Sequence, residues 1–241
     1  MSSQPRPSWL DGPLGQRLLA REAGEVERVL AKMFGLHCLQ VGSWGAPDQF
    51  LRYAQTRSQS LLGETARPGI AAVSRASRLS IASDSVDVLL LPHTLELTSE
   101  PHQVLREAVR VLLGEGHLVV IGFNPWSTWG LRHMLSRKRF PADGLRMIPE
   151  KRIRDWLSLL GMEIRDSVHC VHLPPVNHEA TQRHMSGLES RARKYWPHFS
   201  GVYVVVAQKR VYSALTTRPA WQKKSRVVAG GLVEPTTRTA A

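Results

Sequence analysis

The sequence has few cysteines and no long apolar run. Its 241 residues include two cysteines, Cys38 and Cys170, and both lie in apolar, strand-like surroundings. Such cysteines are usually buried free thiols, so we predict no disulfide framework. No stretch approaches the roughly 18 consecutive apolar residues that a membrane span needs, and the first dozen residues lack the apolar core of a signal peptide. We therefore expect a cytoplasmic protein with no membrane partner.

Acidic residues are scarce relative to basic ones, and the imbalance is local. The chain holds 32 Lys and Arg against 20 Asp and Glu, a formal net charge of +12. Residues 1–131 are balanced with 12 of each sign, whereas residues 132–155 hold eight basic and three acidic residues, and residues 207–241 hold seven and one. Two interpretations stay open: a solvated helix face with a disordered tail, or a docking site for an anionic partner or substrate.

Metal ligands in a usable arrangement are also lacking. Four histidines and one cysteine, His169, Cys170, His172, His178 and His184, form the one cluster that resembles a metal site. No second cysteine or carboxylate pair completes a ligand set of the usual kind. We therefore predict no bound metal.

What the sequence does contain is a strand, a helix and a second strand within residues 83–123. Residues 85–91 turn from polar to continuously apolar, as in a strand that is buried on both faces. Apolar positions then recur at helical spacing, and we expect Gly114 and Gly116 to end that helix. The β-branched run at residues 117–123 supplies the second strand. This βαβ pattern predicts a parallel sheet.

The rest of the chain extends this pattern into one α/β domain over residues 1–210. We expect residues 1–12 to be loose and residues 211–241 to form a basic, disordered tail. The other predicted strands are residues 36–42, 58–64, 70–73, 162–172 and 201–209, and the other predicted helices are residues 13–34, 49–53, 127–140, 151–160 and 181–196.

The βαβ region also resembles a known family. The segments DSVDV (84–88), LPHTLE (91–96), EPHQVLRE (100–107), RVL (110–112) and GHLV (116–119) are similar to the fourth strand, following helix and fifth strand of class I S-adenosylmethionine (SAM) dependent methyltransferases of the type 11 group. The resemblance implies a seven-stranded Rossmann-like sandwich with helices on both faces. It also implies the strand order 3-2-1-4-5-7-6, with strand 7 antiparallel, and SAM as the cofactor.

The resemblance places the cofactor loop directly after the first strand, at Gly42, Ser43, Trp44 and Gly45. In the family, an acidic residue followed by a glycine-rich turn lets the backbone pass close under the ligand. Here Gln40 occupies the place of the acid, and Trp44 occupies the place of a glycine. A plain strand-to-helix turn is the alternative interpretation.

Two further positions bear on the cofactor. Glu64 lies 22 residues beyond Gly42, close to the ~20 at which a nucleotide-binding sheet places its ribose-binding acid. The alternative is an ordinary exposed loop glutamate. The segment between Glu64 and Ile70 is too short for the helix that the family usually has there. Arg75 stands where the family commonly has an adenine-facing aspartate, and Ala76 follows it.

Candidate catalytic residues lie at the ends of the fourth and fifth strands. His93, after Leu91, is a candidate base or a wall of the cofactor pocket. The NPW segment that begins at Asn124 is similar to the N-P-P-Y-like motif of amino-group methyltransferases, but it follows the fifth strand instead of the fourth. We interpret it as a turn, keep Asn124 as a catalytic candidate, and place on the substrate side Trp126, Trp129 and His133.

These observations favour SAM-dependent methyl transfer to an unidentified acceptor, which is either a small molecule or RNA. A second hypothesis is a methyltransferase-like binding or scaffold module that has lost its chemistry, and it is favoured by Gln40, Trp44 and Arg75. A third is an RNA-directed methyltransferase that uses the basic segment 132–154, and RNA affinity should then fall steeply with salt.

Overall fold

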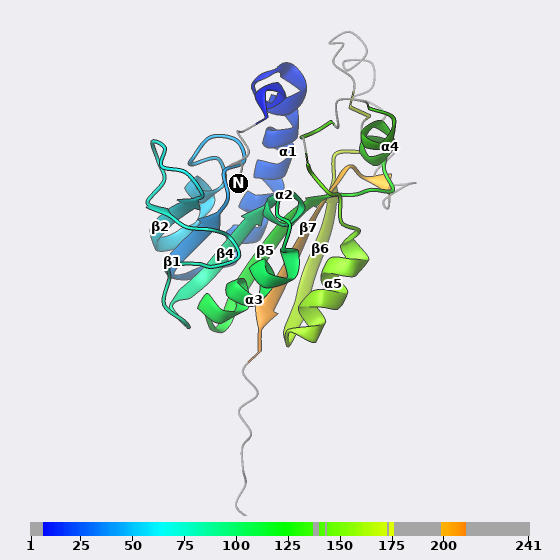
Figure 1. The fold of residues 1–241 in the computed structure, drawn as a ribbon. Coiled ribbons are helices and arrows are strands. Elements are labelled where there is room, and N and C mark those ends of the chain that lie inside the picture. Colours follow the sequence, from blue (N-terminus) through cyan, green and yellow to red (C-terminus); the bar gives the residue numbers. More distant parts are fainter. Residues whose placement is uncertain (1–6, 137–139, 143, 173, 176–198, 211–241) are drawn as a thin grey trace, which may run out of the picture. The chain divides into compact units, whose positions relative to one another are not determined.

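The computed structural model describes residues 7–136, 140–142, 144–172, 174–175 and 199–210 (Figure 1). The predicted helix at residues 181–196 and the predicted tail at residues 211–241 lie outside the described residues.

A seven-stranded mixed sheet forms the centre of the domain, in the order β3-β2-β1-β4-β5-β7-β6. The strands β1 to β5 pair in parallel, and β7 runs antiparallel between β5 and β6. The predicted strand order and the predicted direction of the last strand are confirmed. The strands are β1 (Phe34–Val41), β2 (Gln55–Gly63), β3 (Ala72–Val73), β4 (Val86–Pro92), β5 (Leu112–Phe123), β6 (Met162–Cys170) and β7 (Val202–Lys209).

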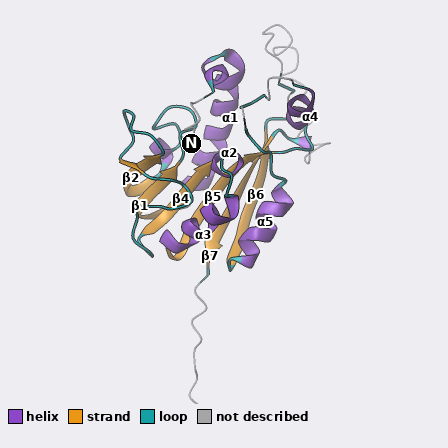
Figure 2. Ribbon diagram, in the orientation of Figure 1, coloured by secondary structure: helices purple, strands orange, loops and turns teal. Residues whose placement is uncertain are grey.

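Helices cover both faces of the sheet (Figure 2). On one face, α1 (Pro13–Leu30) packs its apolar stripe against Cys38 and the side chains that share its side of the sheet. On the other face, α3 (Pro101–Val111) and α5 (Glu150–Leu159) pack against the alternate residues of the same strands. The sheet therefore lies between two hydrophobic cores, because successive side chains of a strand point to opposite faces.

The shorter helices differ in extent from their predictions. Within the segment predicted to be loose, Ser8–Asp11 forms a 3-10 turn (η1). Among the described residues of the helix predicted at residues 127–140, α4 spans Thr128–Leu135, and it begins where the hydroxyl of Ser127 accepts a hydrogen bond from the N–H of Gly130. The remaining short helices are η2 (Leu51–Tyr53) and α2 (Thr94–Leu97).

The segment after α3 also differs from its prediction. The helix ends at Val111 and the chain enters β5 directly, so Gly114 and Gly116 lie inside the strand. The pairing with β4 shifts between Val86 and Val88, which is a bulge. Gly116 lies in this irregular part of the strand, where an added Cβ would meet the carbonyl oxygen of Leu113 at 2.9 Å.

The connection from β2 to β3 is a loop over residues 64–71 without a helix, as the short sequence there predicted. The connection from β1 to β2 contains only the single turn η2. Loops and the single turn η2 therefore border the β1, β2 and β3 end of the carboxyl edge of the sheet.

The described residues also bear on the expectations from composition. Cys38 and Cys170 are both buried and neither forms a disulfide, and burial raises the pKa of Cys38 to about 12. Among the helices described, none has the length and apolar character needed to cross a membrane. In the same part of the chain, no group of three or more His, Cys, Asp or Glu residues could hold a metal ion.

Candidate cofactor site

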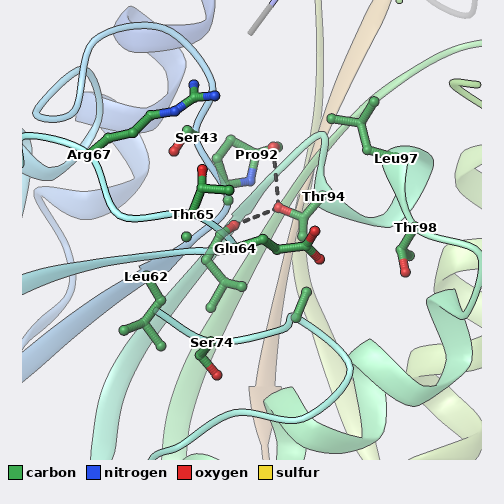
Figure 3. Close-up of a pocket in the computed structure, with 14 residues that line it drawn as sticks. Ser43, Leu62, Glu64, Thr65, Arg67, Ser74, Pro92, Thr94, Leu97 and Thr98 are labelled. Carbon is green, nitrogen blue, oxygen red and sulfur yellow. Dashed lines mark hydrogen bonds between the residues drawn. The ribbon is translucent and has the colours of Figure 1, made fainter. Parts of the chain in front are cut away.

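The carboxyl ends of β1, β2 and β4 border a pocket of about 150 Å³ (Figure 3). Its walls come from the loop after β1, the end of β2 with the following loop, residues 74–76, and the turn and helix after β4. The strand order reverses between β1 and β4. In an open α/β sheet, ligands bind outside the carboxyl ends of the strands at such a reversal.

The floor of this pocket is a close contact between the loops after β1 and β4. The hydroxyl of Thr94 donates to the carbonyl of Val41 at 2.6 Å, and the carbonyl of Pro92 lies 3.3 Å from the same oxygen. Gly42 has φ +93°, and a Cβ added there would lie 2.6 Å from the hydroxyl oxygen of Thr94. Glycine is therefore required at position 42 for two reasons: the backbone there is left-handed, and the hydroxyl of Thr94 leaves no room for a Cβ.

Two charged side chains line the pocket among the residues that the structure describes. Glu64 follows the last residue of β2 and Arg67 lies three positions further on, in the loop to β3. Both are exposed, and Figure 3 shows both side chains at the hollow. The two do not form an ion pair with each other, and apolar side chains of Leu62, Ala76 and Leu97 complete the wall.

A buried charged triad lies beside the pocket, between α1 and the ends of β4 and β5. The Nε2 of His93 is 3.0 Å from the carboxylate of Glu22, and its Nδ1 is 2.8 Å from that of Glu96. All three side chains are at most 1% exposed. The second oxygens of the two carboxylates accept hydrogen bonds from the indole N–H of Trp44 (3.1 Å) and from the backbone N–H of Phe123 (2.8 Å).

Burial and the two carboxylates oppose each other at His93. Burial alone lowers the pKa of His93, but the charges and hydrogen bonds of Glu22 and Glu96 outweigh it and raise that pKa to about 9. Burial acts in the opposite direction at Glu96 and raises its pKa, although the hydrogen bonds of Glu96 to His93 and Phe123 partly offset this. At neutral pH the imidazole is therefore protonated and donates to both carboxylates.

Aromatic rings enclose the triad. His93 lies between Trp44 and Phe123, with ring centroids 4.2 Å from each. Trp129 stacks on Phe123 at 5.6 Å, and Trp9 of the N-terminal turn contacts both tryptophans. Because Trp44, His93, Phe123 and Trp129 are at most 1% exposed, the edge of the sheet over β4 and β5 is filled with side chains.

The structure brings some of the predicted cofactor residues together and separates others. Gly42, Ser43, Glu64 and Ala76 all line the pocket. The other residues predicted to contact the cofactor do not line it: Trp44, Gly45 and His93 pack toward α1, Leu91 lies in the opposite core, and Arg75 is exposed in a bridge with Arg78.

The predicted substrate-side residues occupy different environments. The side chain of Asn124 is buried, and its oxygen accepts the backbone N–H of Trp126 at 3.0 Å, which fixes the turn before α4. Trp126 is 75% exposed, whereas Trp129 is buried in the aromatic cluster. His133 Nδ1 lies 2.6 Å from the carbonyl of Phe140. None of these four residues lines the pocket over β1, β2 and β4.

Sequence reasoning missed Glu22 and Arg67, and it placed Glu96 at the end of the fourth strand without a role. A signal was present for Glu22, because it falls between Leu18 and Val26 at four-residue spacing on the apolar stripe of α1. A carboxylate at such a position must find a buried partner. The partner, His93, is 71 positions away, and no local pattern identifies it.

The strand order, with β7 antiparallel, is that of the class I methyltransferase fold. The methyltransferase-domain family matches residues 25–120. The uncharacterised protein YafS of Escherichia coli K12 is 33% identical over 222 residues, which covers 90% of this chain and 86% of YafS. The chain therefore belongs to the same family as YafS.

Solved structures share the fold. A SAM-dependent methyltransferase of Thermotoga maritima, a possible histamine N-methyltransferase, superposes with a TM-score of 0.61 at 16% identity, covering 80% of this chain and 89% of that protein. A SAM-dependent methyltransferase of Aquifex aeolicus gives 0.54 at 15% identity, covering 86% and 100%. At these identities the likeness establishes the fold alone.

These matches imply SAM as the cofactor, and the pocket fits one part of it. Glycine backbone at Gly42, apolar walls and a carboxylate suit an adenosyl group. Pockets that enclose whole small ligands measure about 300–1,000 Å³, and this one is smaller. The ring of Trp44 fills the adjoining space over β4, and Gln40, in the place of the family's acid, is buried and donates to the carbonyl of Gly42.

Proposed function

We propose that this protein is a SAM-dependent methyltransferase whose pocket over β1, β2 and β4 holds the adenosyl part of the cofactor, and that its acceptor is a molecule still to be identified. The observation that carries the proposal is the position of the Glu64 carboxylate. Its carboxylate lines the pocket at the end of β2, 22 residues after Gly42, at the position where a nucleotide-binding sheet holds a ribose.

The chain's own residues have defined tasks in this proposal. Glu64 accepts hydrogen bonds from ribose hydroxyls, the backbone of Gly42 and Ser43 passes under the ligand, and Leu62 and Ala76 give it apolar contact. When bound, SAM supplies an electrophilic methyl group on its sulfonium. The protein contributes mainly by holding and aligning the reactants.

His93 has a positioning role in this proposal. Its ring is fully buried and its pKa is about 9, so at neutral pH it already carries its proton and both nitrogens are engaged by carboxylates. Such a ring cannot take a proton from an acceptor. It fixes the turn after β4 that carries Thr94 into the floor of the pocket.

Calorimetric titration with SAM and S-adenosylhomocysteine (SAH) tests the proposal. We expect saturable binding of both ligands, and Glu64→Gln should weaken SAH binding by about tenfold or more, which is about 1.4 kcal/mol. Glu27→Gln is the matched control, because Glu27 is exposed on α1 and remote from the pocket lining. Absence of heat and of a thermal shift at millimolar ligand would contradict the proposal.

The filled crevice at Trp44 favours a second candidate, a binding module without methyl transfer. Labelled SAM and cell extract separated into small-molecule, protein and RNA fractions distinguish the two. An enzyme transfers label into one fraction and loses this activity in Glu64→Gln, whereas a module binds SAH and labels none of them. Label in RNA, with RNA affinity that falls steeply with salt, would favour the RNA-directed alternative.

A further inference from the structure

The two charged side chains that line the pocket lie in different parts of it. Glu64 and Arg67 are the charged members among the described residues of its lining. Figure 3 shows the guanidinium of Arg67 on the side of Ser43, across the hollow from Leu97 and Thr98. The side chain of Arg67 makes no hydrogen bond or ion pair with the described part of the chain. This guanidinium is therefore available to a ligand.

Apart from Glu64, the acidic groups near this end of the pocket are, in contrast, already engaged. Glu22 and Glu96 are buried and both bind His93. Gln40 stands where the resemblance expects an acid, and its amide donates to the carbonyl of Gly42 at 3.0 Å. Apart from Glu64, which the proposed function assigns to the ribose, no carboxylate lines the pocket among the described residues, whereas a negatively charged group in a ligand's tail finds Arg67.

We propose that Arg67 binds an anionic group at the 5′ end of the adenosyl ligand, which for SAM is the carboxylate of its methionine part. This inference rests on the proposed function. With the ribose at Glu64 and the base toward Ser74 and Ala76, the 5′ tail extends toward Ser43 and Arg67. A guanidinium forms two parallel hydrogen bonds with a carboxylate or a phosphate, so this end of the site selects ligands by negative charge.

Three adenosine ligands with different tails test this inference by calorimetry on the full chain. SAH carries a carboxylate, 5′-methylthioadenosine has a neutral methyl tail, and AMP has a phosphate. We expect the wild type to bind SAH at least tenfold more tightly than 5′-methylthioadenosine. Arg67→Gln should weaken SAH and AMP, leave 5′-methylthioadenosine unchanged, and reduce the ratio of SAH to 5′-methylthioadenosine affinity to about one. Arg57→Gln, at an exposed arginine of β2 outside the pocket lining, should leave the ratio unchanged.

The outcomes separate this inference from the proposed function. Equal binding of SAH and 5′-methylthioadenosine to the wild type, or a preference for SAH that survives in Arg67→Gln, overturns the role of Arg67 and leaves the adenosyl pocket standing. No binding of either ligand overturns the proposed function and with it this inference. AMP that binds tighter than SAH, and loses this advantage in Arg67→Gln, supports anion recognition but contradicts SAM as the ligand.

Discussion

At the scale of single residues, the buried triad of Glu22, His93 and Glu96 is the most consequential feature. It joins helix α1 to the ends of β4 and β5 through hydrogen bonds of 2.8 and 3.0 Å. His93 also has φ +52°, a conformation that costs a non-glycine residue about 1–3 kcal/mol. Removing one partner of a buried charged group typically lowers stability by about 3–5 kcal/mol. The triad therefore couples the packing of α1 to the structure of the loops at the cofactor edge of the sheet.

The triad makes stability depend on pH above neutrality. Because the pKa of His93 is raised to about 9 in the folded chain, its contribution of about 3 kcal/mol is fully present below about pH 6.5 and is lost as pH rises through about 9. Urea unfolding at a series of pH values should show this decline in the wild type. His93→Gln should lack it, and Glu22→Gln should shift it to lower pH.

Two results would contradict the assignment of this pH dependence to the triad. A free energy of unfolding that stays constant between about pH 6.5 and 9 in the wild type would contradict it. An equally large decline in His93→Gln would contradict it as well, because another group would then be responsible.

Gly42 provides a second test at the residue scale. Gly42→Ala forces a Cβ to within 2.6 Å of the Thr94 hydroxyl at φ +93°, so we expect a loss of roughly 2–4 kcal/mol in stability and weaker SAH binding. In Gly24→Ala, the new Cβ meets nothing within 4 Å on α1, and this control should be stabilised by about 0.5–1 kcal/mol. Thermal unfolding of both variants measures the contrast. Equal stability of the two variants would show that the loop contact is unimportant.

At the scale of elements, Glu150 connects the first turn of α5 to strand β6. Its carboxylate binds His169 at 2.8 Å and the hydroxyl of Ser167 at 2.6 Å. The hydrogen bond from His169, more than any other interaction, lowers the pKa of Glu150 to about 2. This contribution is present above about pH 4.5 and is lost as pH falls through about 2.

Glu150→Gln should therefore destabilise the protein by roughly 1–2 kcal/mol at neutral pH, since the group is partly exposed to solvent. The difference from the wild type should narrow as pH falls below about 4.5. Asp155→Asn is the matched control, because Asp155 is exposed on the same helix. Denaturant unfolding at pH 7 and pH 4 tests this, and a difference that does not change with pH would argue against the salt bridge.

The sequence could predict the elements that depend on local interactions, but not the features that depend on contacts between distant residues. The unit from β4 to β5 was predictable because its apolar spacing and its resemblance to a family are both local. The bulge at the start of β5 and the early end of α4 at Leu135 were not, because pairing with β4 and packing of the last helical turn depend on distant residues. In the site, Glu64 could be placed by its spacing from Gly42, whereas the triad required contacts between residues far apart in the chain.

At the scale of the whole molecule, three arginines in the described part of the basic segment 132–154 make contacts within the protein. Arg132 lies 4.2 Å from the centre of the Phe140 ring, Arg154 pairs with Glu150, and Arg152 lies 6.0 Å from the ring of Trp156. These three arginines do not line the pocket, so we expect the SAH affinity to depend little on them. Replacing Arg152 and Arg154 together by Gln should leave SAH affinity within about twofold, as measured by calorimetry.

The division of the sheet edge is the central property of the molecule. A pocket with Glu64 lies over β1, β2 and β4, and beside it the aromatic cluster and triad close the space over β4 and β5. A crystal structure of the chain with SAH tests this division most directly. We predict the adenosyl group between Glu64 and Ala76, with the indole of Trp44 still against His93. SAH in the space of a displaced Trp44, or an empty pocket at saturating SAH, would contradict this account.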